Sequence, residues 1–278
     1  MKPLKPLPPN RTIEQLHHHY LLEKSIAEKL KIANREERKL IYATMYDELF
    51  KEVPDHPRLT RRENEQQTQA ANKEKLALVR EFLNPSVVFA EFAPGDCRFA
   101  LEVAKYVKTA YAIDISDQRS ENSPTPNNFT LIVYDGYQLN GIPENSVNLM
   151  FSDQFIEHLH PEDTRAHFDL AYHILKPGGK YIVRTPHAIT GPHDISKYFS
   201  YEPEGFHLKE WTYIEFKKLL KELNFSHFSA IWQLRGLRVR LPFFFFEISD
   251  RVLNLLPRKF KRFFGRYLVP TVCLVATK

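Results

Sequence analysis

The chain has 278 residues, 43% hydrophobic and 13% aromatic, enough to bury a core in one elaborated domain or two smaller ones. Its formal net charge of +5 is modest, and no run of about 18 apolar residues occurs, so no transmembrane helix is expected. Two distant cysteines, Cys97 and Cys273, argue against a disulfide framework and indicate a reducing, cytoplasmic location. The N-terminal segment lacks an apolar h-region, so no secretory signal is expected.

The first 84 residues have the pattern of a helical region. A proline-rich tail at residues 1–10 comes first. Three patterns typical of a helix N-terminal capping box follow it, namely Thr12-x-x-Gln15, Asn34-x-x-Glu37 and Thr60-x-x-Glu63. The helices that they open are expected to end near residues 31, 51 and 84. We therefore predict an N-terminal helical region at residues 1–84.

A βαβ unit is predicted next, at Val87–Asp114. The apolar run Val87–Phe92 is typical of a strand buried on both faces, and the turn after it contains Gly95. A helix with one apolar face then leads to a second buried strand that ends in Asp114. Asp114 follows Gly95 by about 20 residues, the spacing at which a carboxylate at the end of a second strand binds a ribose diol.

Strands and helices continue to the end of the chain. Strands are expected at residues 129–134, 145–151, 181–184, 225–234 and 268–277, and helices at residues 161–175 and 212–224. This order of elements predicts an α/β fold.

The loop Glu91-x-Ala93-x-Gly95-x-Cys97 resembles the D/E-x-G-x-G-x-G loop of class I S-adenosylmethionine (SAM) dependent methyltransferases, with Ala93 and Cys97 in place of two glycines. The Glu-His-Leu sequence at 157–159 and the Leu-Lys-Pro-Gly-Gly sequence at 175–179 are similar to later motifs of that family. The resemblance spans residues 87–185 and is to type 11/23-like members from polysaccharide or natural-product pathways. It implies a doubly wound, Rossmann-like, seven-stranded sheet with the last strand antiparallel, in a core at residues 85–278.

The resemblance implies SAM as the cofactor. The cofactor-binding residues that it implies are Glu91, Ala93, Gly95, Asp114, Ile115, Asp135, Gly136, Ser152 and Gln154. In the family the first loop packs against the methionine part of SAM, and a residue in the place of Asp135 lies near the adenine amino group. Helices in the place of residues 1–84 often cover the cofactor, so two hypotheses stay open here: a lid, or packing against the sheet.

A nicotinamide-binding domain is the nearest competing interpretation. Such a domain needs a small residue where Arg98 stands, and it binds a diphosphate near a helix N-terminus. Glu91 and Asp96 place negative charge there, which suits the sulfonium and ammonium groups of SAM better than a diphosphate.

The segment after the fifth strand is expected to line the acceptor pocket, because ligands of open α/β sheets bind beyond the carboxyl ends of the strands. A hydroxyl acceptor needs a base near neutrality, usually histidine. The candidates are His158, His193 and His207, and the first choice is His193 with Asp194 as the orienting group, because their loop follows the fifth strand. A structural role stays an equal alternative for each histidine. The set His187, His193, Asp194 and His207 matches no established metal signature, so no metal is predicted.

Residues 235–266 form an insertion between the last two predicted strands. The insertion holds nine basic and two acidic residues, a net charge of +7, so the remainder of the chain has a net charge of −2. Its aromatic and basic residues fit an amphipathic helix on a membrane surface. A roof over the substrate pocket and a dimer seam are the alternatives. Nucleic acid is not expected as a partner, because no recognition motif accompanies the charge.

These patterns predict a SAM-dependent methyltransferase that acts on an oxygen of a small molecule, a glycan or a lipid-linked acceptor. The alternatives are a SAM-fold binding protein without catalysis, a membrane-tethered scaffold, and an NAD(P)-dependent oxidoreductase. The expected location is cytoplasmic, with peripheral contact to the inner face of a membrane through residues 235–266. The oligomeric state is left open.

Overall fold

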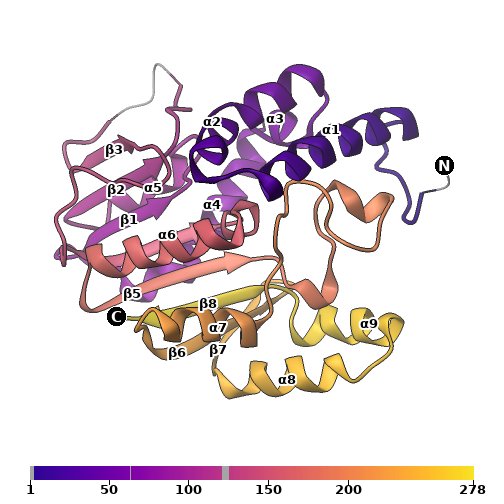
Figure 1. Cartoon of the computed structure of the whole chain (residues 1–278). Helices are drawn as coiled ribbons and strands as arrows, with labels where there is room; N and C mark the ends of the chain where they lie inside the picture. The colour runs from indigo at the N-terminus through magenta and orange to yellow at the C-terminus, as the bar shows by residue number, and fades with distance from the viewer. Residues whose placement is uncertain (1–2, 63, 121–124) are drawn as a thin grey trace.

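The structure of the chain, a computed structural model, describes residues 3–62, 64–120 and 125–278. A sheet of eight strands forms the middle layer, and helices cover both of its faces (Figure 1). The strands are β1 (Val88–Phe92), β2 (Thr109–Asp114), β3 (Phe129–Val133), β4 (Val147–Asp153), β5 (Leu175–Thr185), β6 (Ser226–Leu234), β7 (Leu237–Pro242) and β8 (Val272–Thr277). Their order in the sheet is β3-β2-β1-β4-β5-β8-β6-β7.

The first five strands are parallel, and β8 lies between β5 and β6, antiparallel to both. The predicted α/β doubly wound sheet with an antiparallel last strand is therefore confirmed. In a parallel arrangement of this kind, the carboxyl ends of β1, β2 and β4 meet at one edge, where a ligand crevice forms.

The predicted number of seven strands is wrong, because part of the predicted insertion forms an additional edge strand. Arg235 and Gly236 make a two-residue turn after β6, and both have positive φ angles, of 49° and 86°. Such a turn closes an antiparallel hairpin, so β7 pairs with β6 from Leu234 and Leu237 outward. The basic side chains of Arg238 and Arg240 on this edge are of the kind that disfavours pairing with another chain.

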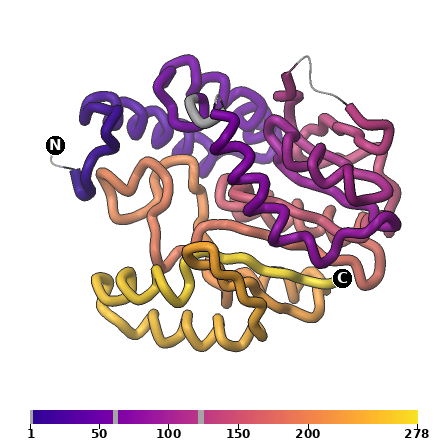
Figure 2. Tube along the Cα trace, turned by 180° about the vertical axis from the view of Figure 1, so that it is seen from behind, coloured from indigo at the N-terminus to yellow at the C-terminus, as the bar shows by residue number. Residues whose placement is uncertain are grey.

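Two groups of helices enclose the sheet. On one face, α6 (Pro161–Ile174), α7 (Tyr213–Glu222) and α8 (Phe244–Asn254) share a core with the sheet through residues such as Phe168, Phe216 and Phe246. On the other face, α4 (Glu65–Val79) and α5 (Arg98–Ala104) contribute Val79 and Phe99 to a second core. Figure 2 shows α4 crossing this second face. The last helix, α9 (Arg258–Leu268), lies beside α8.

The N-terminal helices α1 (Ile13–Ile32), α2 (Arg35–Glu52) and α3 (Pro57–Arg62) lie beyond the carboxyl edge of the sheet (Figure 1). The first two predicted capping boxes are confirmed, with Thr12 capping α1 and Asn34 capping α2. The third predicted helix start is wrong, because residues 57–62 form α3 and Asn64 caps a separate α4. The predicted Thr60-x-x-Glu63 box includes Glu63, which lies outside the described residues.

The loop after β1 keeps a backbone suited to glycine although two of its positions carry side chains. Ala93, Gly95 and Cys97 have φ angles of 52°, 61° and 61°. A residue with a Cβ is strained by about 1–2 kcal/mol in this left-handed conformation, so the two substituted positions store strain in the loop. Cys97 compensates through burial of its free thiol in the second core, whereas Ala93 is only partly buried.

We expect Ala93→Gly to stabilise the fold by roughly 0.5–1 kcal/mol. Relief of about 1–2 kcal/mol of strain outweighs the roughly 0.5–1 kcal/mol that the freer glycine adds to the entropy cost of folding. The free energy of unfolding from urea titration measures the difference. Ala90→Gly is the matched control: Ala90 is fully buried in β1, so this change should destabilise. A loss of stability in Ala93→Gly would contradict the strain argument.

Candidate active site

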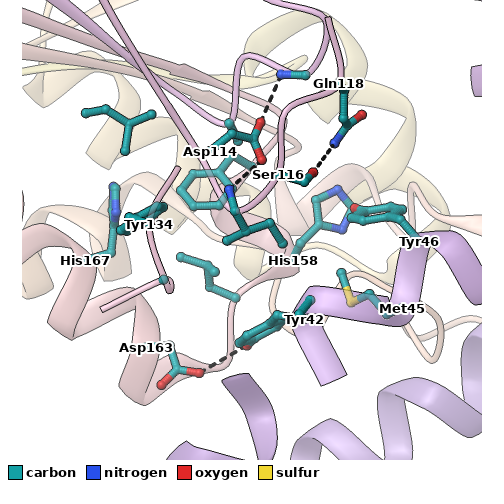
Figure 3. Close-up of a pocket in the computed structure, with 18 of the residues that line it drawn as sticks. Tyr42, Met45, Tyr46, Asp114, Ser116, Gln118, Tyr134, His158, Asp163 and His167 are labelled. Atoms are coloured by element: carbon teal, nitrogen blue, oxygen red, sulfur yellow. Dashed lines mark hydrogen bonds between the residues drawn. The ribbon is translucent and has the colours of Figure 1, made fainter. Parts of the chain in front are cut away.

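A cavity of about 220 Å³, called here the cofactor cavity, lies at the carboxyl ends of β1, β2 and β4. Figure 3 shows how side chains from the sheet edge and from α2 enclose it. Six of the nine predicted cofactor-binding residues line it: Ala93, Gly95, Asp114, Ile115, Gly136 and Gln154. The carboxyl edge of the parallel strands is therefore the site of the crevice, as the strand pattern predicts.

Asp114 is the central acidic group of the cofactor cavity. The backbone N–H of Gly95 donates to its Oδ2 at 3.1 Å, and the N–H of Ile115 donates to its Oδ1 at 2.7 Å (Figure 3). Burial raises the pKa of the Asp114 carboxyl, and these backbone hydrogen bonds oppose the shift. Two fixed donors leave each carboxylate oxygen with accepting capacity toward the cavity, as a ribose diol requires.

Helix α2 supplies a wall of the cofactor cavity that the sequence analysis did not assign. Its lining residues include Tyr42, Met45, Tyr46 and Phe50, which recur at the spacing of one helix face. This periodicity was the available signal. The side chains are aromatic or polarizable, and such surfaces pack well against a flat ring.

A buried ion pair fixes α2 in this position. Arg38 of α2 donates from Nε to Oδ2 of Asp163 at 2.7 Å and from Nη2 to Oδ1 at 2.9 Å. The hydroxyl of Tyr42 also donates to Asp163 Oδ2, at 3.1 Å, and accepts from the N–H of His160 at 2.8 Å. Both charged side chains are almost fully buried, so loss of one partner would leave an uncompensated charge.

Three predicted cofactor residues, Glu91, Asp135 and Ser152, do not line the cavity. Asp135 pairs with Lys39 of α2 at 2.7 Å and caps the turn that follows it through the N–H of Tyr137. That ion pair and the turn hydrogen bonds hold the pKa of Asp135 at about 2. Ser152 is buried in β4.

Glu91 belongs to a charge cluster on the α4 side of the sheet. Its Oε1 lies 3.6 Å from Nζ of Lys75, which is also 3.6 Å from Asp153. Asp153 in turn accepts two hydrogen bonds from Arg184, at 2.6 and 2.7 Å. Burial raises the pKa of Glu91 to about 7, although the Lys75 charge opposes the shift. The Glu91 side chain therefore lies on the α4 side of the sheet and not at the cofactor cavity.

A second cavity of about 760 Å³, called here the acceptor cavity, adjoins the first. It is lined by residues of the N-terminal region and of the loop after β5, including three of the four predicted catalytic residues, His193, Asp194 and His207. The fourth, His158, lines both cavities, as do Gln154, Tyr46 and Arg58. The two cavities therefore share a wall, which we call the junction.

His158 presents one ring nitrogen at the junction. Its Nδ1 lies 3.0 Å from the carbonyl oxygen of Phe206, an acceptor, so Nδ1 carries the proton and Nε2 has a free lone pair. Burial, with the charges of His207 and Arg58, lowers the pKa of His158 well below its ordinary value. The ring is neutral near pH 7 and lies beside Tyr46 (Figure 3).

His207 is held among carboxylates. Its Nδ1 is 2.8 Å from Oε1 of Glu210, and its ring packs edge-on against His158. Burial opposes the charged form, but the hydrogen bond to Glu210 and the charges of Glu157 and Asp194 outweigh it and raise the pKa to about 9.

The predicted pairing of His193 with Asp194 does not appear in the hydrogen bonds. Nε2 of His193 lies 2.9 Å from the hydroxyl of Thr190. The Asp194 carboxylate accepts from the N–H groups of Ser196, at 3.0 Å, and Gly205, at 2.9 Å, so it organises the loop instead.

The strand order and the crevice define a Rossmann-like α/β domain built to hold a nucleoside-type ligand. Residues 90–183 match the methyltransferase domain family. This segment is thus a class I SAM-dependent methyltransferase domain, and SAM is its cofactor.

Two solved structures show the same fold. One chain of a complex between the Haloferax volcanii Trm112 methyltransferase activator and a putative methyltransferase has a TM-score of 0.53 and 15% identity, covering 74% of this chain and 88% of that one. The Burkholderia thailandensis 1,6-didemethyltoxoflavin-N1-methyltransferase, bound to 1,6-didemethyltoxoflavin and S-adenosylhomocysteine, has a TM-score of 0.54 and 13% identity, covering 89% and 91%. A comparison with curated proteins found no match.

We expect Glu91→Gln to flatten the pH dependence of stability. The pKa of Glu91 rises from 4.5 in the unfolded chain to about 7 in the fold, so the folded state favours the uncharged carboxyl. The free energy of unfolding is therefore highest below pH 4.5 and falls as the pH rises through 7. Between about pH 5 and pH 8 the wild type should lose roughly 2–3 kcal/mol of unfolding free energy relative to Glu91→Gln. Urea titrations at several pH values measure this. The exposed Glu144→Gln is the control and should follow the wild type; an unchanged slope in Glu91→Gln would contradict the expectation.

Proposed function

We propose that this protein transfers a methyl group from SAM to an oxygen of a small molecule or of a glycan or lipid-linked acceptor. The observation that carries the proposal is the junction, where Gln154 and His158 line both the cofactor cavity and the acceptor cavity. Methyl transfer requires donor and acceptor to meet at about 3–3.5 Å, and two adjoining cavities with a shared wall supply such a meeting point.

The side chains and backbone groups that line the cofactor cavity are of the kinds that SAM requires. Asp114 offers a fixed carboxylate for a ribose diol, Gly95 leaves room for close approach, and Tyr134 and Phe155 offer aromatic surface. When bound, SAM supplies an electrophilic methyl group. The structure supports Ala93, Gly95, Asp114, Ile115, Gly136 and Gln154 as its binding residues, since all six line the cavity.

The acceptor side supports an oxygen nucleophile, because several groups there can take up a proton. His158 is the best placed, with a neutral ring and a free Nε2 at the junction. His207 is charged near pH 7 and suits binding of an acidic acceptor group, and His193 and Asp194 line the same cavity but not the cofactor cavity. We therefore rank His158 first as the base.

The N-terminal helices are proposed as a lid. Helix α2 covers the cofactor cavity through Tyr42 and Met45, and α1 contributes His19 and Glu23 to the acceptor cavity. They are attached to the core through apolar contacts with Phe206 and Ile195 and through polar contacts such as Arg38–Asp163. A lid of this kind excludes water from the reacting groups.

We expect Asp114→Asn to weaken SAM binding by about 10-fold or more, since one charge-assisted hydrogen bond to a diol contributes roughly 1.5–3 kcal/mol. Isothermal titration calorimetry with SAM measures the affinity. Asp117→Asn is the control, because Asp117 is an exposed carboxylate that pairs with Arg119 and does not line the cavity.

Titration of the wild type with NAD provides the opposing outcome: tight NAD binding without a SAM response would replace this proposal with an oxidoreductase. SAM binding without methylation of any acceptor in a cell extract would favour a non-catalytic binding protein.

The helical part of the basic insertion supports a peripheral membrane contact. Ten of the nineteen exposed large apolar side chains among the described residues lie between residues 244 and 268. They are Phe244, Phe245, Ile248, Val252, Leu255, Phe260, Phe263, Phe264, Tyr267 and Leu268. Most recur at helical spacing on α8 or α9, so each helix has an apolar face without a covering element in the described chain.

The charge of α9 distinguishes between two candidate partners of this surface, a second copy of the chain and an anionic bilayer. Helix α9 carries five basic residues and no acidic one, so two copies of the surface would bring like charges together in a dimer. An anionic bilayer matches both the charge and the apolar face. The exposed phenylalanines do not line either cavity, which disfavours a pocket roof. In the described part of the chain, no helix is long and apolar enough to cross a bilayer.

Two buried contacts tie this helical pair to the acceptor side. Nε2 of His187, at the start of the loop after β5, lies 2.9 Å from Oδ1 of Asp250 on α8, and both side chains are fully buried. Gly265 of α9 packs on Ile189 and Thr190 so closely that an added Cβ would lie 2.9–3.0 Å from them. A lipid-linked acceptor could therefore reach the acceptor cavity from an adjacent bilayer.

We expect the wild type to float with vesicles of phosphatidylcholine and phosphatidylglycerol, more weakly at high salt and with phosphatidylcholine alone. The combined change Phe260→Ser, Phe263→Ser and Phe264→Ser should reduce the bound fraction at least about tenfold, because it removes apolar insertion from exposed positions. Ile32→Ser with Leu40→Ser, at exposed apolar positions of the N-terminal region, is the matched control. A different outcome would favour a dimer seam: the wild type does not float with vesicles, but it forms dimers that the triple variant does not form.

A further inference from the structure

Three side chains beside the junction form a compact group of metal-ligating type. Glu157 and His158 belong to the short 3₁₀ helix η2 (Ile156–His158) after β4, and His207 lies in the loop before α7. One ligand atom from each of the three lies within 4.8 Å of the other two. A pair of histidines with one carboxylate is a common ligand set for a divalent transition metal.

Both histidines are oriented as metal ligands usually are. The Nδ1 of His158 faces the carbonyl of Phe206, and the Nδ1 of His207 faces the carboxylate of Glu210. Metal-binding histidines typically donate their other ring N–H to a carbonyl or carboxylate, which fixes the tautomer and leaves the second nitrogen for the ion. Among the described residues, no hydrogen bond occupies the Nε2 of either ring.

The third group contains a buried oxygen that lacks a partner. Glu157 is fully buried, and its Oε2 accepts from the hydroxyl of Thr185 at 2.8 Å. Its Oε1 has no hydrogen-bond partner among the described residues. A buried, unpartnered carboxylate oxygen is costly and calls for a missing donor or ion.

We propose that Glu157, His158 and His207 bind a divalent transition-metal ion such as Zn²⁺ or Mn²⁺, with an open coordination position toward the acceptor cavity. His158 and His207 both line that cavity, so the open position would face the acceptor. Three protein ligands and one open position are the arrangement of a catalytic rather than a structural site.

The surrounding charges favour a cation here. The carboxylates of Glu157, Glu210 and Asp194 all act on His207, and Arg58 is the opposing cation that lines both cavities.

The second group of possible ligands, His19, Glu23 and His56, is less suited. Arg11 donates to Nδ1 of His19 at 3.0 Å, and Nε2 of His19 lies 2.7 Å from Glu23, so neither ring nitrogen is available. The contrast identifies the group at the junction as the better site and provides an internal control.

The consequence for catalysis rests on the proposed methyl transfer, whereas metal binding itself does not. An ion at the junction would orient an acceptor hydroxyl and lower its pKa. In that case His158 would act as a ligand, and the proton would leave to another group of the acceptor cavity.

The test uses the full chain, dialysed against a chelator and then titrated with Zn²⁺, with Co²⁺ absorption spectra as a second probe. We expect one ion per chain by elemental analysis. Glu157→Gln and His207→Gln should each lower the affinity by about 100-fold or more, as loss of one of three ligands should exceed the 10–100-fold effect of an outer-shell change. His56→Asn should leave the affinity unchanged.

The proposal would be overturned by no ion above background, by weak binding at several sites, or by an affinity that survives Glu157→Gln. Loss of binding in His56→Asn would do so as well, by assigning the ion to the other group. Circular dichroism checks that each variant folds. Calorimetry with SAM tests the methyltransferase proposal separately from the metal site. The three metal ligands do not include Asp114 or its hydrogen-bond partners, so SAM binding can persist when metal binding fails.

Discussion

The carboxylate of Asp114 is the contact on which the site depends. It accepts backbone hydrogen bonds from Gly95 and Ile115, so one side chain joins the loop after β1 to the end of β2. That loop runs through left-handed backbone at Ala93 and Cys97. The hydrogen bonds to Asp114 offset part of its strain, and they place an acidic group at the edge of the crevice where a ribose would bind.

The cavity wall depends on a contact between distant parts of the chain. Arg38 and Asp163 are 125 residues apart, yet their ion pair sets where α2 lies over the cofactor cavity. The same helix carries Tyr46 to the junction, where both cavities meet. The cofactor cavity is thus completed by a region outside the segment that matches the methyltransferase domain family.

Features governed by neighbouring residues were predictable from the sequence. The caps at Thr12 and Asn34, the strand that ends in Asp114, the strand that precedes Gln154, and the sheet direction depend on local propensity and spacing. Glu91 illustrates a missed local signal. Alternation along β1 puts Ala90 and Phe92 in one core, so Glu91 must face the other side, toward α4.

Features governed by tertiary packing were not predictable. The periodicity of α2 assigns Met45 to one helix face, but no local pattern indicates which surface that face covers, or where Arg58 lies, because both depend on how α2 and α3 pack. Strand β7 was missed for a different reason: its alternating basic residues resembled a charged insertion, and the signal of the Arg235–Gly236 turn was overlooked.

The buried His187–Asp250 pair links the exposed helices α8 and α9 mechanically to the loop that lines the acceptor cavity. A surface that bound α8 and α9 would therefore lie at a fixed distance from the opening of the acceptor cavity. An acceptor anchored in such a surface would reach the cavity only if the linker between its anchor and its reacting group had a suitable length. The protein would then select acceptors by linker length as well as by chemical identity.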